Sequence, residues 1–271
     1  MNKINIGITG STGSLGKELL KFSKELNFIS FKKDIRSKKK LKKWFEKNNF
    51  DAIFHLAAIV PIKEVNKNKN KALEVNFFGT KNIVDEVINN NIKWFFFSST
   101  SHVYSSSKKK ISERFKSKPI SFYGKTKRLA EDYIIKKFKN NNNDYCIGRI
   151  FSTTNKLQKE NYLVPDLKKR IKNSNKKILL KNLNHYRDFI SLKDLTKIII
   201  KLYKKRFRGI INLGSGNSIH LKTIAMIIAK KYGKNLEFED NKIPTHLVAN
   251  VEKMKKFCRY RLSKKIETQI F

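Results

Sequence analysis

A glycine-rich turn near the N-terminus places the strongest constraint on this chain. The apolar run Ile4–Thr9 leads into Gly10-Ser11-Thr12-Gly13-Ser14-Leu15-Gly16, and a helical pattern then continues to about Leu26. In such a strand–turn–helix unit the first glycine permits the tight turn, the second lets the backbone approach a pyrophosphate, and the third lets helix and strand pack closely. The free N–H groups that open the helix favour an anion. The pattern therefore predicts a dinucleotide-binding unit, here with Gly-x-x-Gly-x-x-Gly spacing.

The rest of the first half continues the alternation that this unit begins. Short apolar runs alternate with helical patterns, which is typical of a parallel α/β sheet. We therefore expect a Rossmann-type doubly wound sheet over residues 1–151. The expected strands cover 4–9, 28–31, 52–56, 94–98 and 145–151, and the expected helices cover 14–26, 39–48, 72–90 and 123–138.

After residue 151 the segments become shorter. Helical patterns cover 164–173, 192–203 and 221–232, with strands near 178–180 and 210–213. We expect residues 152–271 to form a smaller α/β substrate-binding lobe that packs intimately on the first domain, with room for the two to interleave.

The charge of the chain is extreme, and its distribution decides how to interpret it. In 271 residues, 61 Lys and Arg against 22 Asp and Glu give a formal net charge of +39. Such a field attracts polyanions, so a nucleic-acid or anionic membrane partner has to be weighed. However, Lys greatly outnumbers Arg, and the excess is spread over nearly every surface segment, together with many Asn, Ile and Phe. A dedicated nucleic-acid surface would favour clustered arginine. Compositional drift is the better explanation, and we expect no nucleic-acid partner.

Cysteine and histidine do not suggest a metal or a disulfide framework. The two cysteines, Cys146 and Cys258, lie far apart, and the five histidines show no ligand spacing. No apolar run is long enough to cross a membrane, and the first strand already uses the N-terminal residues that a signal peptide would need. We therefore expect a cytoplasmic protein with reduced thiols, no metal and no membrane partner.

The tip of the second expected strand bears on the choice of cofactor. An acidic residue at this position would accept the ribose hydroxyls of NAD, but the strand runs into Lys32 and Lys33 instead. Two cations suit a 2′-phosphate, so the sequence favours NADP over the alternative NAD. Asp34 and Ile35, which follow, are placed to contact the adenine edge.

A tyrosine and a lysine one helical turn apart form the candidate catalytic pair. Tyr123-Gly-Lys-Thr-Lys127 places both side chains on one helix face. A phenol with a reference pKa near ~10 is a poor acid or base at neutral pH, and a neighbouring ammonium lowers that pKa. The same lysine can hold the nicotinamide ribose. A hydroxyl from the segment Ser98-Ser99-Thr100-Ser101, at the end of the preceding strand, can polarise the substrate oxygen.

Together these motifs resemble the extended short-chain dehydrogenases/reductases, the group of nucleotide-sugar epimerases, dehydratases and ketoreductases. The similarity runs from about Ile4 to Phe257. It rests on the glycine turn and the Tyr/Lys pair together with five further motifs: His55-Leu-Ala-Ala58, Asn76-x-x-Gly79-Thr80, Ser98-Ser99-Thr100-x-x-Val103-Tyr104, Arg187-Asp188-Phe189-Ile190 and Ile211-Asn212-Leu213-Gly214-Ser215-Gly216.

The resemblance implies a role for each matching position. Tyr123 would be the acid/base, Lys127 its modulator, and Thr100 the hydroxyl that bonds the reacting oxygen. Arg187 would hold the diphosphate of a sugar nucleotide, the alternative being a structural ion pair with a neighbouring acid. The implied cofactor contacts are Gly10, Thr12, Gly13, Ser14, Leu15, Gly16, Lys32, Lys33, Asp34, Ile35, Leu56, Ala57, Ala58, Asn76, Ser98, Tyr123, Lys127 and Phe151. The implied substrate contacts are Thr100, Ser101, His102, Ser152, Leu163 and Arg187.

Departures from the family pattern narrow the expected reaction. Dehydratases of the group carry Asp-Glu after the catalytic Thr, whereas this chain has Ser101-His102, so we do not expect dehydration. The usual Arg-x-x-Asn motif after the sixth strand ends here in Ser152. The short connection after the second strand is like that of the deoxysugar 4-ketoreductases. His102 is either an additional acid/base or a polar wall of the pocket, and we expect His55 to be a satisfied histidine at a strand end.

Three functions from different classes remain open. The leading hypothesis is an NADPH-dependent 4-ketoreductase that acts on a nucleoside-diphosphate deoxysugar. The alternative is a nucleotide-sugar 4-epimerase with tightly held NAD. A remote alternative, which the charge motivates, is a non-catalytic cofactor sensor or nucleic-acid binder. The two long helices at 72–90 and 123–138 offer a seam for a homodimer.

Overall fold

The computed structural model describes residues 4–22, 24, 26–155, 158, 161–175, 177–262 and 270. These residues form two compact units. The first unit comprises Met1–Tyr104, Lys116–Ile150 and Thr196–Ile211, and the second comprises Ser105–Phe115, Phe151–Leu195 and Asn212–Phe271. The chain thus passes from the first unit to the second near the expected boundary. It also returns, because Thr196–Ile211 lies in the first unit although the sequence suggested the smaller lobe.

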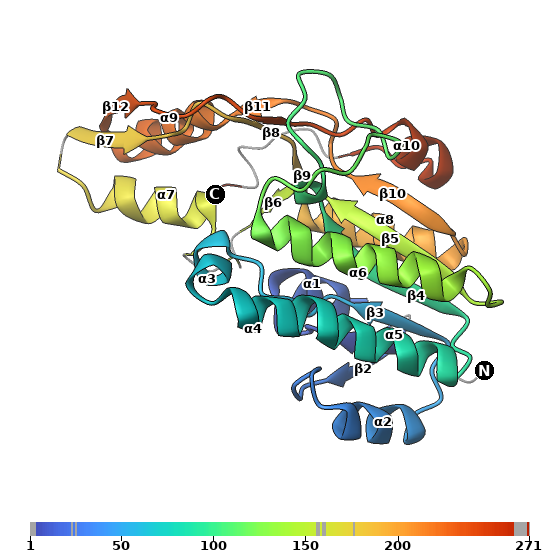
Figure 1. The fold of residues 1–271 in the computed structure, drawn as a ribbon. Helices are drawn as coiled ribbons and strands as arrows, with labels where there is room; N and C mark the ends of the chain where they lie inside the picture. The colour runs from blue at the N-terminus through green and yellow to red at the C-terminus, as the bar shows by residue number, and fades with distance from the viewer. Residues whose placement is uncertain are drawn as a thin grey trace. The chain divides into compact units, whose positions relative to one another are not determined.

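A six-stranded sheet forms the centre of the first unit (Figure 1). Its strand order is β10-β5-β4-β3-β1-β2, and the pairings from β5 to β2 are all parallel. This is the doubly wound Rossmann-type sheet that the sequence predicts. The strands are β1 (Asn5–Thr9), β2 (Asn27–Phe31), β3 (Ala52–His55), β4 (Trp94–Thr100), β5 (Asp144–Ile150) and β10 (Gly209–Leu213).

Helices cover both faces of this sheet. They are α1 (Ser14–Leu20), α2 (Lys38–Glu46), α3 (Ile62–Lys67), α4 (Lys69–Leu73), the π turn η1 (Glu74–Gly79), α5 (Thr80–Asn89), the short 3₁₀ turn η2 (Ser101–Val103), α6 (Phe122–Phe138) and α8 (Leu192–Lys204).

Strand β4 shows why the central strands are apolar without alternation. Phe95 stacks on Phe138 of α6, with ring centroids 5.8 Å apart. Trp94 contacts Tyr203 of α8, with centroids 5.4 Å apart, and its indole N–H donates to a carbonyl at 2.9 Å. A parallel strand with helices on both faces buries every side chain, and each of these aromatic rings removes a large apolar area from water.

Two expected helices differ from the structure. The pattern at 14–26 predicts one helix, but α1 ends at Leu20 and a turn follows, closed by a hydrogen bond from Leu26 N to Phe22 O (3.1 Å). The helix expected at 72–90 contains the π turn η1, in which Asn76 is fully buried. The extra backbone residue of a π turn redirects one side chain, and such turns are frequent at functional sites.

The second unit is built from short strands and helices. Its elements are β6 (Ser152–Thr154), α7 (Leu163–Lys172), β7 (Lys177–Lys181), β8 (Tyr186–Arg187), β9 (Phe189–Ser191), β11 (Ile219–His220), α9 (Leu221–Tyr232), β12 (Asn235–Glu239), β13 (His246–Leu247) and α10 (Glu252–Cys258). The strands pair as β11-β8-β13, β12-β7 and β6-β9. Apolar residues of α7 and α9, such as Ile171 and Ile228, form its core.

No helix among the described residues is both long enough and apolar enough to cross a membrane. In the same part of the chain Cys146 and Cys258 are buried and form no disulfide.

Candidate active site

The glycine turn between β1 and α1 has the geometry that a bound dinucleotide requires. Gly10 has φ of +72°, and a Cβ there would lie 2.6 Å from the backbone N of Ala57. A Cβ on Gly16 would lie 2.6 Å from Cα of Ser11, so this glycine lets α1 pack on the turn. Gly13 differs, because a Cβ there would meet only the Gly10 carbonyl, at 3.4 Å. The space beside Gly13 is therefore open, and the expected approach of a pyrophosphate there meets no steric obstacle.

The segment after β3 forms the second wall beside this turn. Leu56 N donates to Thr9 O at 3.2 Å, and Ala57 N donates to Thr9 Oγ1 at 3.3 Å. His55 lies behind the wall with both ring nitrogens engaged, by Thr9 Oγ1 at 2.6 Å and by Thr80 Oγ1 at 2.9 Å. Burial, helped by the positive charge of Lys127, lowers the pKa of His55 well below its ordinary value. This neutral, doubly bonded imidazole is the satisfied histidine at a strand end that the sequence suggested.

Asn76 supports the same wall from the π turn. Its amide accepts from Ile59 N at 2.8 Å and donates to Ile59 O at 2.9 Å. It also donates to Thr126 Oγ1 at 3.2 Å, and Thr126 in turn donates to the carbonyl of Tyr123. The sequence placed Asn76 near the cofactor ribose. In the structure its side chain joins the backbone of the cofactor wall to helix α6.

The loop after β2 carries the candidate contacts to the adenosine. Lys32 and Lys33 are exposed, and Ile35 is buried against Gly79. The carboxylate of Asp34 accepts three bonds from the Arg36 guanidinium, at 2.7–3.1 Å. These hydrogen bonds lower the pKa of Asp34. The Asp34 carboxylate is therefore engaged by Arg36 and does not compete with a phosphate for Lys32 and Lys33.

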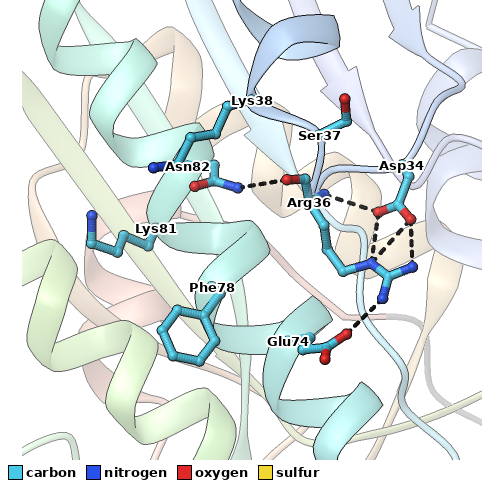
Figure 2. A pocket seen from close by; sticks show the side chains of 8 residues that line it. All are labelled: Asp34, Arg36, Ser37, Lys38, Glu74, Phe78, Lys81 and Asn82. Carbon is cyan, nitrogen blue, oxygen red and sulfur yellow. Dashed lines mark hydrogen bonds and ion pairs between the residues drawn. The ribbon is translucent and has the colours of Figure 1, made fainter.

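Beyond this loop lies an open pocket of about 760 Å³ (Figure 2). Most of its charged groups are already paired, since Arg36 also bonds Glu74 at 2.6 Å and Lys81 bonds Asp85 at 3.0 Å. No residue of the glycine turn lines it. Asp34, an expected contact of the adenine edge, does line it.

The three predicted catalytic residues lie on β4 and α6, two elements that pack against each other. Thr100 ends β4 and is 6% exposed, and its hydroxyl accepts from His102 N at 3.2 Å. Tyr123, 7% exposed, lies in the first turn of α6 and packs on Val65. Lys127 follows one turn later and is buried, with Nζ 3.9 Å from the centre of the Phe97 ring.

The setting of Lys127 is electrostatically unusual. Burial lowers its pKa to about 7, against the opposing attraction of Glu131 one turn further along α6. An amine with a pKa near neutrality can lose and regain a proton at working pH, as a group that assists an acid/base residue must.

His102 lies beside the catalytic tyrosine. Its ring centroid is 6.0 Å from that of Tyr123, in an edge-on arrangement, and its Nδ1 is 3.2 Å from Ser121 Oγ. Ser121 also caps α6 by accepting from Gly124 N. Thus His102 helps to fix the start of α6, whichever of its two expected roles it has. Ser98 is half-buried and Ser101 is buried, on either side of Thr100.

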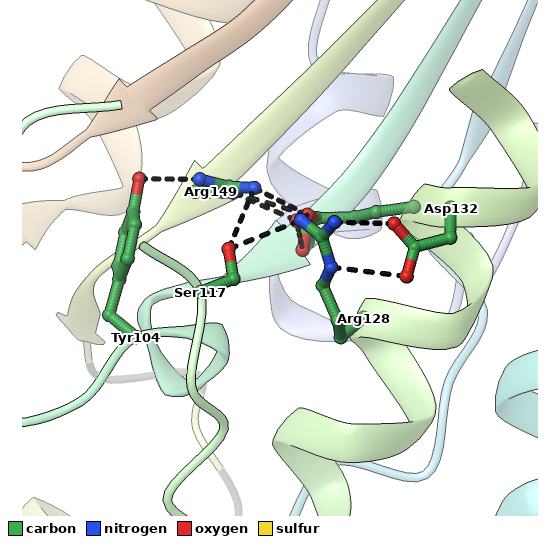
Figure 3. A network of polar contacts seen from close by, with 7 residues as sticks. Tyr104, Ser117, Arg128, Asp132 and Arg149 are labelled. Carbon is green, nitrogen blue, oxygen red and sulfur yellow. Dashed lines mark hydrogen bonds and ion pairs between the residues drawn. The ribbon is translucent and has the colours of Figure 1, made fainter. Parts of the chain in front are cut away.

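A buried polar network that the sequence analysis missed lies behind these groups (Figure 3). Glu131 of α6 and Arg149 of β5 form an ion pair with Nη2 and Oε2 2.6 Å apart. Ser99 and Tyr104 complete the network through hydrogen bonds. The available signal was an arginine within an otherwise apolar strand pattern, because a charge at such a position demands a buried partner.

In the second unit, Arg187 is the candidate for binding an anion. Its guanidinium donates to the carbonyls of Tyr186 and Thr245 and to Thr245 Oγ1, at 2.8–2.9 Å. Burial lowers its pKa to about 10. Among the described residues no carboxylate bonds to it, so the structural ion pair considered above is not formed there. A largely buried cation that only neutral oxygens contact retains an electrostatic preference for an anion.

The remaining predicted residues of the second unit lie near its first strands. Phe151 is buried, and its backbone N donates to Leu213 O at 2.9 Å. Ser152 N donates to Asp188 O at 2.8 Å, which links it to the strand next to Arg187. Leu163 opens α7 and is 38% exposed. Among the described residues, no cluster of three His, Cys, Asp or Glu could hold a metal.

Comparisons with known proteins agree with this geometry. The sequence model of the GDP-mannose 4,6-dehydratase family matches residues 8–267. A GDP-6-deoxy-D-talose 4-dehydrogenase from Aggregatibacter actinomycetemcomitans is 26% identical over 256 residues, covering 89% of this chain and 84% of that protein.

Two solved structures share the fold. A UDP-glucose 4-epimerase from Thermus thermophilus, in complex with NAD, superposes with a TM-score of 0.87 at 18% identity, covering 98% of this chain and 96% of the other. RMD from Pseudomonas aeruginosa, complexed with NADPH, superposes with a TM-score of 0.88 at 16% identity, covering 99% and 96%.

Proposed function

Because the chain belongs to the GDP-mannose 4,6-dehydratase family of extended short-chain dehydrogenases/reductases, whose members are NAD(P)-dependent oxidoreductases and epimerases, we propose that it is an NADPH-dependent 4-ketoreductase of a nucleoside-diphosphate deoxysugar. The observation that carries the proposal is the buried pair of Tyr123 and Lys127, one turn apart on α6, on a helix that packs against the strand ending at Thr100.

The proposed chemistry assigns one task to each of these groups. NADPH bound at the turn Gly10–Gly16 would supply the hydride that the carbonyl carbon needs. Tyr123 gives its phenolic proton to the carbonyl oxygen as the charge develops there, and Thr100 donates a hydrogen bond to the same oxygen. Lys127, with a pKa lowered to about 7, stabilises the phenolate that remains and passes a proton back. Burial of all three groups excludes water from the reacting atoms.

The direction of the reaction and the cofactor rest on separate observations. Ser101 and His102 stand where a dehydratase of this family would carry Asp and Glu, so the chain lacks the acid/base pair for water loss. The relative at 26% identity is a 4-dehydrogenase of a GDP-6-deoxy sugar, and the reverse of such an oxidation is the proposed reduction. Lys32 and Lys33 at the end of β2 favour the 2′-phosphate of NADP over NAD.

Substrate binding falls to the second unit in this proposal. Arg187 would hold the diphosphate through charge-assisted hydrogen bonds, with Ser152 and Leu163 beside the sugar. Its lack of a carboxylate partner among the described residues supports this role.

The test uses the purified full-length chain. NADPH oxidation is followed with 4-keto-6-deoxy sugars carried on GDP, UDP or dTDP, with Tyr123→Phe as the matched control. We expect oxidation with at least one of these sugars, and a loss of about 10²-fold or more in kcat for Tyr123→Phe. No oxidation with any of them would refute the proposed function.

The cofactor that copurifies separates the reductase from the epimerase. A 4-epimerase regenerates its NAD in each cycle and needs no added cofactor. Stoichiometric NAD(H) in the purified protein, together with interconversion of UDP-hexoses, would therefore replace the reductase by the epimerase. Tight duplex-DNA binding at physiological salt, with full function in Tyr123→Phe, would instead favour the non-catalytic alternative.

We also propose a homodimer. Phe78 of η1 and Leu129 of α6 are 48% and 46% exposed, respectively. Large apolar residues on two neighbouring helical segments favour a helix-packed seam between two copies. Sedimentation of the wild-type chain and of Leu129→Lys tests this, since a dimer seam predicts that the variant is monomeric.

A further inference from the structure

The first unit contains a buried ion pair to which the proposed chemistry gives no task. The side chains of Glu131 and Arg149 are 0% and 2% exposed. Three hydrogen bonds hold them together, from Nη2 to Oε2 at 2.6 Å and from Nε to Oε1 at 3.0 Å and to Oε2 at 3.3 Å. Burial alone would lower the pKa of Arg149, but the bonds and charge of Glu131 hold it above its ordinary value. Arg149 therefore keeps its positive charge inside the protein.

The pair is the centre of a network that joins four segments, namely β4, β5, α6 and the residue after η2 (Figure 3). Ser99 of β4 donates to Glu131 Oε1 at 2.5 Å. Arg149 of β5 donates through Nη1 to the hydroxyl of Tyr104 at 2.8 Å, and its guanidinium lies 4.8 Å from the centre of that ring. Arg128 of α6 adds a longer bond to Glu131, at 3.3 Å. Few hydrogen-bonding positions on the two ions are left unused.

Stability alone does not account for such a pair. The cost of desolvating two ions commonly equals or exceeds their attraction, and apolar residues of similar size often serve stability equally well. What a buried pair can provide is a defined geometry, because fork-like guanidinium–carboxylate bonds tolerate little displacement.

Three of the joined segments carry or adjoin the predicted site residues. Ser99 directly precedes Thr100 on β4. Glu131 lies one turn beyond Lys127 on α6, and two turns beyond Tyr123. Tyr104 directly follows η2, the turn that holds His102. Each anchor of the network is thus within two residues or two helical turns of a group that the reduction needs.

We propose that Glu131 and Arg149 form a positioning pair, which holds the end of β4 at a fixed distance from the face of α6 that carries Tyr123 and Lys127. The two ions touch neither substrate nor cofactor. They act through Ser99 on the position of Thr100, and through the axis and rotation of α6 on the other two groups. The prediction for turnover rests on the proposed reduction.

An electrostatic effect supports the same role. Glu131 opposes the lowering of the Lys127 pKa, so its carboxylate favours the ammonium that stabilises a Tyr123 phenolate. At longer range the positive charge of Arg149 cancels most of the electric field of the Glu131 carboxylate. Removing both ions together changes no net charge, yet Lys127 loses a nearby carboxylate.

The decisive variant replaces both ions by apolar residues, Glu131→Leu with Arg149→Met. We expect it to unfold in urea near the wild-type midpoint and to bind NADPH like the wild type. Its kcat with the accepted 4-keto sugar should fall about 10²-fold, the loss typical of a misplacement of about 1 Å at reacting groups. The control is Asp132→Asn, which removes the carboxylate next to Glu131 on α6. The Asp132 side chain is 52% exposed, and the only ion of the network with which it pairs is Arg128. This control should leave kcat unchanged.

A second variant keeps the ion pair and removes only its link to β4. Ser99→Ala should lower kcat by about tenfold, with the NADPH dissociation constant and the urea midpoint unchanged. If the double variant does not fold, this variant decides. A kcat within about twofold of wild type, in Ser99→Ala or in a folded double variant, overturns the proposal. A loss of kcat that is explained entirely by the fraction of unfolded protein overturns it as well.

A measurement without substrate separates this inference from the proposed function. Phenolate absorbance, taken as the difference between each protein and the same protein with Tyr123→Phe, reports the ionisation of Tyr123. In the folded double variant, or in Ser99→Ala if the double variant does not fold, the midpoint should move to higher pH, toward that of Lys127→Met. An unchanged midpoint overturns the positioning role even if a 4-keto sugar is reduced. A shifted midpoint in a protein that reduces no such sugar leaves the positioning role standing and removes the reductase.

Discussion

Replacing Lys127 by methionine should stabilise the protein while removing its activity. The Nζ atom of Lys127 lies inside the first unit, 3.9 Å from the centre of the Phe97 ring, and burial lowers its pKa from 10.5 to about 7. An unfolded chain keeps this amine charged up to about pH 10.5, whereas the folded chain prefers it neutral above about pH 7. Methionine has nearly the same length and needs no proton, so Lys127→Met removes that penalty.

The size and sign follow from proton linkage. The difference of about 3.5 units between 10.5 and about 7 corresponds to about 5 kcal/mol of stability at most. Between these two values the unfolded state binds more protons than the folded state, so the wild-type free energy of unfolding gains about 1.4 kcal/mol per pH unit as the pH rises. The advantage of the variant is therefore complete below about pH 7 and disappears toward pH 10.5.

Urea unfolding of both proteins from about pH 6 to about pH 9 measures this difference. Other lysines titrate equally in both proteins and cancel. Lys125→Met is the matched control, because Lys125 is exposed on the same helix. It should show no pH-dependent difference from wild type. A Lys127→Met advantage that stays constant over this range, or a variant less stable than wild type at about pH 7, would refute the reasoning.

Three further changes probe the cofactor and substrate sites. Lys32→Glu with Lys33→Glu should weaken NADPH binding about tenfold more than NADH binding, because the 2′-phosphate would meet two negative charges; fluorescence titration with both cofactors checks this, and equal losses would contradict the NADP assignment. Gly13→Ala should keep the wild-type melting temperature, since its Cβ meets only one atom at 3.4 Å, but should lose cofactor affinity by about tenfold or more; unchanged affinity would exclude this turn as the cradle. Arg187→Met should raise the KM for the sugar nucleotide about 30-fold, the equivalent of about 2 kcal/mol for a charge-assisted bond, and leave NADPH affinity unchanged; an unaltered KM would remove Arg187 from the substrate site.

The parts of the fold that the sequence predicted are those with local signals. The doubly wound sheet follows from apolar runs that alternate with helical patterns, and the glycine turn follows from spacing alone. The placement of Tyr123 and Lys127 on one face of α6 follows from the period of the helix. In each case residues close in sequence determine the outcome.

Other features depend on contacts between distant segments. The π turn at Glu74–Gly79 has no recognisable sequence pattern, because it is accompanied by a contact between Asn76 and the backbone of Ile59, 17 residues earlier. The partner of Arg149 could not be identified either. Its charge in a buried strand demanded an acid, but only the packing of α6 on β5 selects Glu131 from the 22 acidic residues of the chain.

Burial distinguishes the few internal cations of the chain from its many surface cations, which composition alone could not do. Of the Lys and Arg side chains in the described part of the chain, only those of Lys127 and Arg149 are buried, and both lie next to the proposed catalytic groups. Arg187 is largely buried and lacks a carboxylate partner within that part. Most of the remaining cations lie on the surface, where the solvent and salt screen each charge and where substitution costs little. A lysine excess can therefore accumulate there by drift without touching the chemistry. The net charge of +39 describes the surface, whereas the proposed function depends on a few cations whose burial has a cost that only a specific role offsets.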